Sequence, residues 1–137
     1  MRIAPGPPPL TGGGGDLAAA CAYANGFDQD AKPFAGSATP IACRDKSAAT
    51  AAVGTYKPNA FGLFDTAGNV ASWTADCWNA SIARVPADGT ARTDGDCRRH
   101  VMRGGSWADT SLAAADRAGV PAGRATVGQG FRLARVL

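Results

Sequence analysis

The sequence predicts a small, loop-rich domain that is either α+β or mostly β, and three properties of it point to this class. Its 137 residues are enough for one domain with a modest core. Hydrophobic residues make up 45 % and charged residues 18 %, which is typical of a globular chain rather than a disordered one. The 18 Gly and 9 Pro together exceed the usual share, so turns and short strands are favoured over long helices.

The N-terminal region is expected to hold a leader and one helix. Residues 1–15 are rich in Pro and Gly, and we predict that they form a disordered leader. The run that follows predicts a helix over 16–24, with Asp16 as its N-cap. Asn25-Gly26 would end this helix, because both residue types are common at helix C-termini.

The rest of the chain is expected to alternate short strands with long loops. Residues 25–52 and 79–99 predict two loops, and a loop as long as the first needs a disulfide or an ion to hold it. Val70 to Trp73 predicts a strand. Residues 108–117 are expected to be a short helix or irregular, and residues 130–137 predict a terminal strand from the alternation at their start.

The charge pattern excludes some classes of partner. The net charge is +3 with a pI of about 8.9, and the basic residues are interspersed with acidic ones. The densest basic spot is Arg98-Arg99-His100, which falls short of the Lys/Arg stripe that nucleic acid needs. No run of about 18 apolar residues predicts a membrane span. The first residues also lack an apolar run of signal-peptide length.

The cysteines leave two alternatives open. Cys21, Cys43, Cys77 and Cys97 allow three pairings, and no C-x-x-C motif occurs among them. An even count in a small Gly-rich domain indicates disulfides and an oxidising compartment, hence a periplasmic or secreted protein, although no signal peptide accompanies it. The alternative is four buried free thiols.

Three segments resemble one family signature. They are PNAFGLFDTAGNVASW at 58–73, VMRGGSW at 101–107 and GFRLAR at 130–135. In this order they resemble the motifs of the formylglycine-generating-enzyme, or sulfatase-modifying-factor, family. The resemblance implies a C-type-lectin-like α+β fold, of which residues 16–137 would be a partial domain with the N-terminal half truncated. A strand edge left unpaired in this way would favour self-association.

The resemblance also implies a calcium site in the first loop. Its ligands would be the side chain of Asn25, the carbonyl of Gly26, the carboxylate of Asp45 and the carbonyl of Ser47. Hard oxygen ligands from a loop suit Ca²⁺. The alternative is that Asn25 and Asp45 only form Asx-turns.

A second calcium site is implied more weakly. It would use Asn69 and the carbonyl of Val70, but Ser72 stands where the family has a glutamate. Losing a carboxylate lowers calcium affinity, so we expect this site to be weak or empty.

The resemblance further implies which cysteines pair. Cys21 and Cys43 flank the ligands of the first site, so a bridge between them would fix that loop. Cys77 and Cys97 match the D-C-W and G-D-C segments of a subgroup of the family, and a bridge between them would close the second loop.

The residues at the family's catalytic position argue against catalysis. Active members carry out an oxygen-dependent protein modification, the conversion of a sulfatase cysteine to formylglycine, with copper held by two cysteines shortly after the G-G-S-W motif. No Cys follows Trp107 in this chain, and His100 alone cannot build the histidine cluster of the related iron enzymes. We therefore expect no catalytic residues, copper or iron, and a fold-supporting role for Gly104, Gly105, Ser106, Trp107 and Arg132.

Two functions follow from these expectations. The first is a pseudoenzyme that acts as a calcium-stabilised binding module for an unidentified protein or small molecule. Its loops 25–52, 79–99 and 108–128 would present the contact surface. The second is a fragment of the oxidoreductase whose chemistry comes from a missing segment or a partner. A degenerate product without function is a third alternative.

Overall fold

The computed structural model describes residues 17–31, 38–59, 61–113 and 115–134. The predicted leader at 1–15 lies outside these residues. The described chain is mostly strand and loop with little helix, and its elements are α1 (Leu17–Ala20), β1 (Ala71–Trp78), β2 (Asp96–Arg103), β3 (Arg117–Pro121) and β4 (Gln129–Gly130). No helix in these segments is long and apolar enough to cross a membrane.

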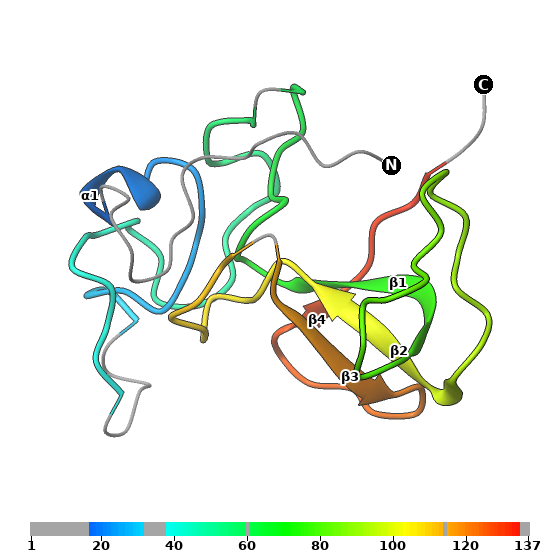
Figure 1. Ribbon diagram of the computed structural model, residues 1–137. Coiled ribbons are helices and arrows are strands. Elements are labelled where there is room, and N and C mark those ends of the chain that lie inside the picture. The colour runs from blue at the N-terminus through cyan, green and yellow to red at the C-terminus, as the bar shows by residue number, and fades with distance from the viewer. Residues whose placement is uncertain (1–16, 32–37, 60, 114, 135–137) are drawn as a thin grey trace.

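The strands form one twisted sheet in the order β3-β2-β1-β4. β2 pairs antiparallel with β1 and β3, whereas β4 pairs parallel with β1 through only two residue pairs. Figure 1 shows the sheet on one side of the molecule, with α1 and the irregular chain before residue 50 on the other. The molecule therefore has a sheet half and a loop half.

β1 is longer than the predicted strand. The expected strand ends at Trp73, where Thr74 and Asp76 interrupt the apolar run, but the structure continues it to Trp78. The two polar side chains have local partners: the Thr74 hydroxyl donates to the Asp76 carboxylate at 2.9 Å. The extension buries Cys77, which pairs with His100 of β2.

Two predictions about the second half of the chain are wrong in part. The predicted loop 79–99 includes the start of β2 at Asp96, and the region 108–117, predicted to be a short helix or irregular, ends where β3 begins at Arg117. Both strands form because they pair with each other over five residues, from Arg99 with Pro121 to Arg103 with Arg117. β3 reads Arg-Ala-Gly-Val-Pro, and glycine and proline are depleted in strands, so its own sequence does not indicate a strand.

The terminal elements are shorter than predicted. The strand expected over 130–137 is reduced to Gln129–Gly130, and residues 135–137 lie outside the described chain. Phe131 and Leu133 are 76 % and 86 % exposed, so no neighbouring sheet surface holds them in a strand. The helix expected over 16–24 extends only from Leu17 to Ala20 and ends in a turn at the disulfide-bonded Cys21.

The principal core cluster lies in the loop half. Ala20, Ala24, Ile41 and Leu112 are buried together, and Cys43 and Ala67 pack against them. Trp73 and Trp107 are only partly buried. This cluster has only four members, and two of them are alanines, so we expect other restraints to help to hold this half.

A close backbone contact joins the two halves. Gly68 has φ +73°, and a Cβ there would lie 2.0 Å from the carbonyl oxygen of Asn25. The same oxygen accepts the N–H of Asn69 at 2.7 Å. Only glycine allows this approach, which fixes the first loop against the start of β1.

Candidate functional site

The candidate calcium site lies in the loop after α1, and local contacts fold this loop back on itself. Cys21 and Cys43 form a disulfide with a Cα–Cα distance of 6.1 Å. Asp28 and Ile41 form an isolated β-bridge beside it. These contacts bring the start of the loop against the segment that contains Asp45.

Asn25 is fully buried in this site, with none of its surface exposed. Its amide nitrogen donates to the carbonyl of Ala49 at 2.8 Å and lies 3.4 Å from Oδ1 of Asn69. Its Oδ1 is buried and has no hydrogen-bond partner among the described residues. A buried acceptor without a partner is rare and indicates a place where a donor or a cation would be stabilised.

Asp45 holds the opposite part of the loop. Its Oδ1 accepts the N–H of Ser47 at 2.8 Å, and its Oδ2 accepts the N–H of Gly26 at 3.2 Å. Burial raises the pKa of Asp45 to about 6, although these N–H groups act in the opposite direction, and the charges of Asp28 and Asp30 add to the rise. The structure thus brings together Asn25, Gly26, Asp45 and Ser47.

Two further carboxylates, which the sequence does not predict for this site, lie close to Asp45. Carboxylate oxygens of Asp28, Asp30 and Asp45 fall within 4.8 Å of one another. Asp28 is fully buried, and its Oδ1 accepts the N–H of Asp30 at 2.8 Å. Asp30 forms an ion pair with Arg44. Their Asp-x-Asp spacing was the available signal, but it is also common in ordinary polar turns.

The chemistry of these groups suits a hard cation. An amide oxygen and several carboxylate oxygens are the ligands that Ca²⁺ prefers. A cation would also offset the mutual repulsion of the buried carboxylates. The alternative of Asx-turns describes the same N–H contacts of Asp28 and Asp45, but it leaves the Asn25 oxygen without a partner.

The residues predicted for a second calcium site do not form an acidic cluster like that of the first site. The amide of Asn69 forms two hydrogen bonds with the backbone of Ala51, at 2.9 and 3.1 Å. Val70 and Ser72 line a cavity of about 490 Å³ together with Asp65. Asp65 has a buried Oδ1 without a hydrogen-bond partner in the described chain, and the sequence does not predict it for this site. It places a carboxylate in the cavity that Ser72 cannot supply.

All four cysteines of the sequence are in disulfides. Cys21 pairs with Cys43, and Cys77 pairs with Cys97. No cysteine of the chain is free. The oxidised chain therefore has no thiolate with which to hold a soft metal such as Cu(I).

Ser106, His100 and Asp116 are polar residues outside the two candidate calcium sites. The hydroxyl of Ser106 donates to Asp109 at 2.7 Å and so closes a turn. His100 lies in β2 and lines a separate cavity with Trp73. Asp116 accepts a hydrogen bond from the hydroxyl of Ser111.

The residues of the family motifs support particular backbone conformations. Gly104 and Gly105 have φ +93° and +66°, which a side chain would disfavour. The guanidinium of the exposed Arg132 donates to the carbonyl of Phe64. Arg132 therefore connects the end of the described chain to the backbone of an earlier loop.

Solved structures that are similar to this chain include two longer proteins. One is PvdO from Pseudomonas aeruginosa, with a TM-score of 0.66 and 27 % identity over 81 % of this chain and 38 % of that chain. Another is Treponema denticola variable protein 1, with a TM-score of 0.61 and 30 % identity over 83 % of this chain and 36 % of that chain. This chain therefore spans less than two fifths of either protein.

Comparison with sequences gives a family. No curated protein matches the chain significantly. Residues 11–137, which include the motifs, both disulfides and the candidate calcium site, match the Sulfatase-modifying factor enzyme 1-like domain. On this match the chain belongs to the family of sulfatase-modifying-factor, or formylglycine-generating-enzyme, domains.

Proposed function

We propose that this chain is a non-catalytic member of its family, a pseudoenzyme that acts as a calcium-stabilised binding module. The orphaned Oδ1 of Asn25 is the observation that carries the calcium part of this proposal. The ligands of the calcium ion would be Asn25 Oδ1, the Asp45 carboxylate and the carbonyls of Gly26 and Ser47. Bound Ca²⁺ would supply positive charge to a buried acidic loop. Asn69 and Val70 would contribute to a second, weaker site.

The cysteines support the non-catalytic part. The four sulfur atoms are used in disulfides, and no cysteine follows the Gly-Gly-Ser-Trp segment. We therefore expect neither copper nor iron. The disulfides also favour an oxidising location, either periplasmic or secreted. We further infer a C-type-lectin-like α+β fold for residues 16–137, with loops 25–52, 79–99 and 108–128 as the binding surface.

Calcium binding can be tested by thermal unfolding in excess CaCl₂ and in EDTA. A ligand that binds only the folded state at about 100 times its Kd stabilises it by roughly 2.7 kcal/mol, so Tm should rise by several degrees. Asp45→Asn should remove most of the rise, while Asp88→Asn, at an exposed carboxylate in another loop, should keep it. An equal Tm with and without calcium would contradict the proposal.

A second candidate is a fragment of an oxidoreductase that converts a sulfatase cysteine to formylglycine. The limited coverage of PvdO and the Treponema protein favours it, because a missing segment or a partner could supply the chemistry. The test is incubation with a Cys-x-Pro-x-Arg peptide, copper and oxygen, followed by mass spectrometry. An aldehyde product would favour this candidate over the first.

We also propose self-association through the sheet edge at β4. This strand pairs through only two residues, and the adjacent Phe131 and Leu133 are largely exposed. Exposed apolar side chains beside a short edge strand favour pairing with another chain. Light scattering on the purified chain tests this, with Phe131→Ser expected to shift any dimer toward monomer.

A further inference from the structure

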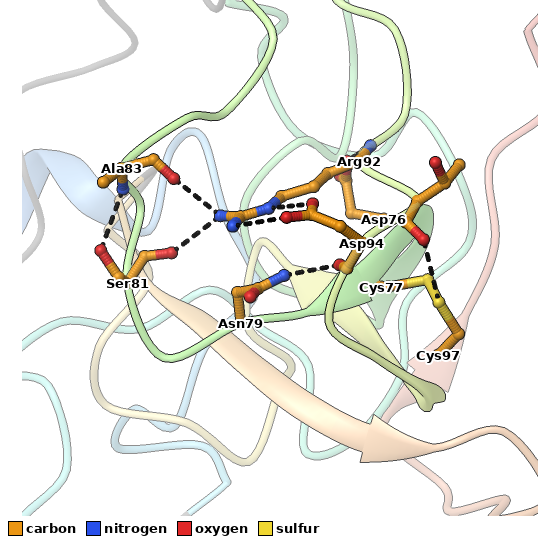
Figure 2. Close-up of polar contacts among 9 residues, drawn as sticks. Asp76, Cys77, Asn79, Ser81, Ala83, Arg92, Asp94 and Cys97 are labelled. Atoms are coloured by element: carbon orange, nitrogen blue, oxygen red, sulfur yellow. Dashed lines mark hydrogen bonds and ion pairs between the residues drawn. A yellow bond between two sulfur atoms is a disulfide. The ribbon is translucent and has the colours of Figure 1, made fainter.

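The loop between β1 and β2 is held by one buried arginine. The Arg92 side chain donates through Nε and Nη2 to the Asp94 carboxylate, at 2.6 and 3.2 Å. Its Nη1 donates to the carbonyls of Ser81 and Ala83, at 3.1 and 2.8 Å. Figure 2 shows the guanidinium between these two stretches of the loop. One side chain therefore fixes both sides of the loop relative to each other.

The backbone anchors the same loop to the sheet. The N–H of Arg92 donates to Asp76 of β1, and the carbonyl of Arg92 accepts the N–H of Cys77, both at 2.8 Å. The amide of Asn79 donates to the Asp94 carbonyl at 2.7 Å, and the Cys77–Cys97 disulfide closes the base (Figure 2). The loop is thus ordered before any partner arrives.

The tip of this ordered loop presents apolar side chains to solvent. Ile82 and Val85 are 69 % and 49 % exposed. Arg84 lies between them with φ +66°, a backbone conformation that is uncommon for a side-chain-bearing residue. An ordered loop that exposes aliphatic groups is expected at a binding surface, since less entropy is lost when a partner covers it.

Next to the tip, a sheet face carries two arginines around a tryptophan. Trp78 lies over Gly119, where a Cβ would be 2.2 Å from the ring. The Arg99 and Arg117 guanidinium carbons are 5.5 and 4.8 Å from the ring centre. The strand register places both arginines on one face, on either side of the Val101–Gly119 pair. Stacking on Trp78 holds these cations in place.

Arg117 connects the sheet face to the start of the β1–β2 loop. Nη2 of Arg117 donates to the carbonyl of Ala80 at 2.6 Å, two residues before Ile82. Across the described segments, Arg84, Arg99 and Arg117 have no carboxylate within ion-pair distance; the ion pairs formed there are Arg44–Asp30, Arg92–Asp94 and Arg98–Asp96. Asp94 and Asp96 are near enough to Arg84 and Arg99 for their charges to interact, but they form no direct ion pair with these two arginines. The surface therefore combines aliphatic groups with three arginines that are not in ion pairs.

We propose that the arginine–loop surface, formed by Ile82, Arg84, Val85, Arg99 and Arg117, binds an acidic polypeptide segment that also carries aliphatic side chains. Guanidinium groups match carboxylates in geometry and charge, and the exposed Ile82 and Val85 need an apolar partner that a small anion lacks. The inference rests on the proposed function as a binding module, and it assigns one loop and one class of partner to it.

A labelled probe peptide with alternating Glu and Leu tests this surface by fluorescence anisotropy. The peptide should bind, and its analogue with Gln in place of Glu should bind much more weakly. Arg84→Gln and Ile82→Ser should each weaken binding by roughly fivefold or more, as expected for contacts central to an interface. Arg84 has no side-chain hydrogen bond or ion pair among the interactions described above, so its substitution should leave the fold intact.

Lys46→Asn is the matched control for charge. It removes one positive charge from the irregular chain before residue 50, which lies on the other side of the molecule from the sheet (Figure 1). The backbone there has φ +71°, which Asn tolerates. Binding by this variant should equal that of the unmodified chain.

Two results would overturn the inference. One is no binding of the acidic peptide, and the other is an equal loss of binding in Lys46→Asn and Arg84→Gln. The calcium-dependent Tm of the same samples reports separately on the proposed function.

Discussion

Asp45 is buried in an acidic loop, so its protonation should affect the stability of the folded state. Its pKa is about 6 in the folded chain against 3.8 for an ordinary aspartate, so the folded state binds the proton more tightly. The stability from this proton is fully present below the unfolded pKa and is lost as pH rises through the folded pKa.

We predict that, in EDTA, Tm falls as the pH is raised from about 4 to about 6.5, the window between these two pKa values. Asp94 and Asp96 do not mask this trend, because Arg92 and Arg98 lower their pKa values and move their effect to more acidic pH. Thermal unfolding across this window measures it. Asp45→Asn should flatten the dependence; a Tm that rises with pH in the unmodified chain would contradict the prediction.

Gly119 offers a test of packing at a single residue. A Cβ there would lie 2.2 to 2.7 Å from three atoms of the Trp78 ring, and the rigid ring must move. We predict that Gly119→Ala destabilises the chain by about 1–3 kcal/mol, as overpacking usually does, and shifts the tryptophan fluorescence. Gly123→Ala is the control, since a methyl group at that position would meet no atom within 4 Å. Equal Tm values for the two variants would disprove this role.

At the scale of the element, the conformation of the β1–β2 loop depends on the buried Arg92 side chain. Arg92→Met keeps a long apolar side chain but removes the bonds to Asp94, Ser81 and Ala83. We predict faster trypsin cleavage after Arg84 in this variant, because local opening exposes the backbone to the protease. Mass spectrometry of the fragments follows the site. Arg44→Met, in the other half, should leave the Arg84 cleavage rate unchanged.

The elements also indicate what the sequence could predict. The motifs around Gly62, Asn69 and Gly105 identified the family, because glycine and aromatic spacing is local information. The start of β1 was predictable for the same reason. β3 was not, because Arg117–Pro121 becomes a strand only through its pairing with β2. The predicted helix was too long because turn geometry at Cys21 overrides the helix propensity of alanine.

The candidate site, too, was predicted from the sequence only in part. Asn25, Gly26, Asp45 and Ser47 came from family resemblance, and the structure brings them together. Asp28 and Asp65 were missed, since their relation to these sites depends on how the loops fold. Arg92 was also missed, because an arginine followed by Thr93 and Asp94 looks solvent-exposed until its burial is known.

At the scale of the whole molecule, crosslinks compensate for a small core. The principal cluster contains two alanines, one isoleucine and one leucine. Each disulfide closes a loop with a sequence separation of 22 or 20 residues. In the chain-entropy model a loop of this length gives roughly 3 kcal/mol of stability, which is a large part of the total for a small domain.

We therefore predict that reduction with a phosphine lowers Tm sharply, as calorimetry would measure. The double variant Cys77→Ser/Cys97→Ser should lose about 3 kcal/mol. The double variant Cys21→Ser/Cys43→Ser should also weaken calcium binding, because that disulfide holds the Asn25 loop. Unchanged stability after complete reduction, verified by thiol titration, would show that packing alone holds the fold.

The β1–β2 loop is closed both by the Arg92 side chain and by the Cys77–Cys97 disulfide, and this has a consequence for engineering. Asn79 to Ala83 and Arg92 to Asp94 are held by the arginine, the sheet and the disulfide, whereas residues 86–90 take no part in those bonds. Foreign sequence spliced between Ala87 and Asp88 would therefore be carried on a fixed frame. The domain could serve as a display scaffold in which the inserted sequence changes while the flanking segments of the loop keep their conformation.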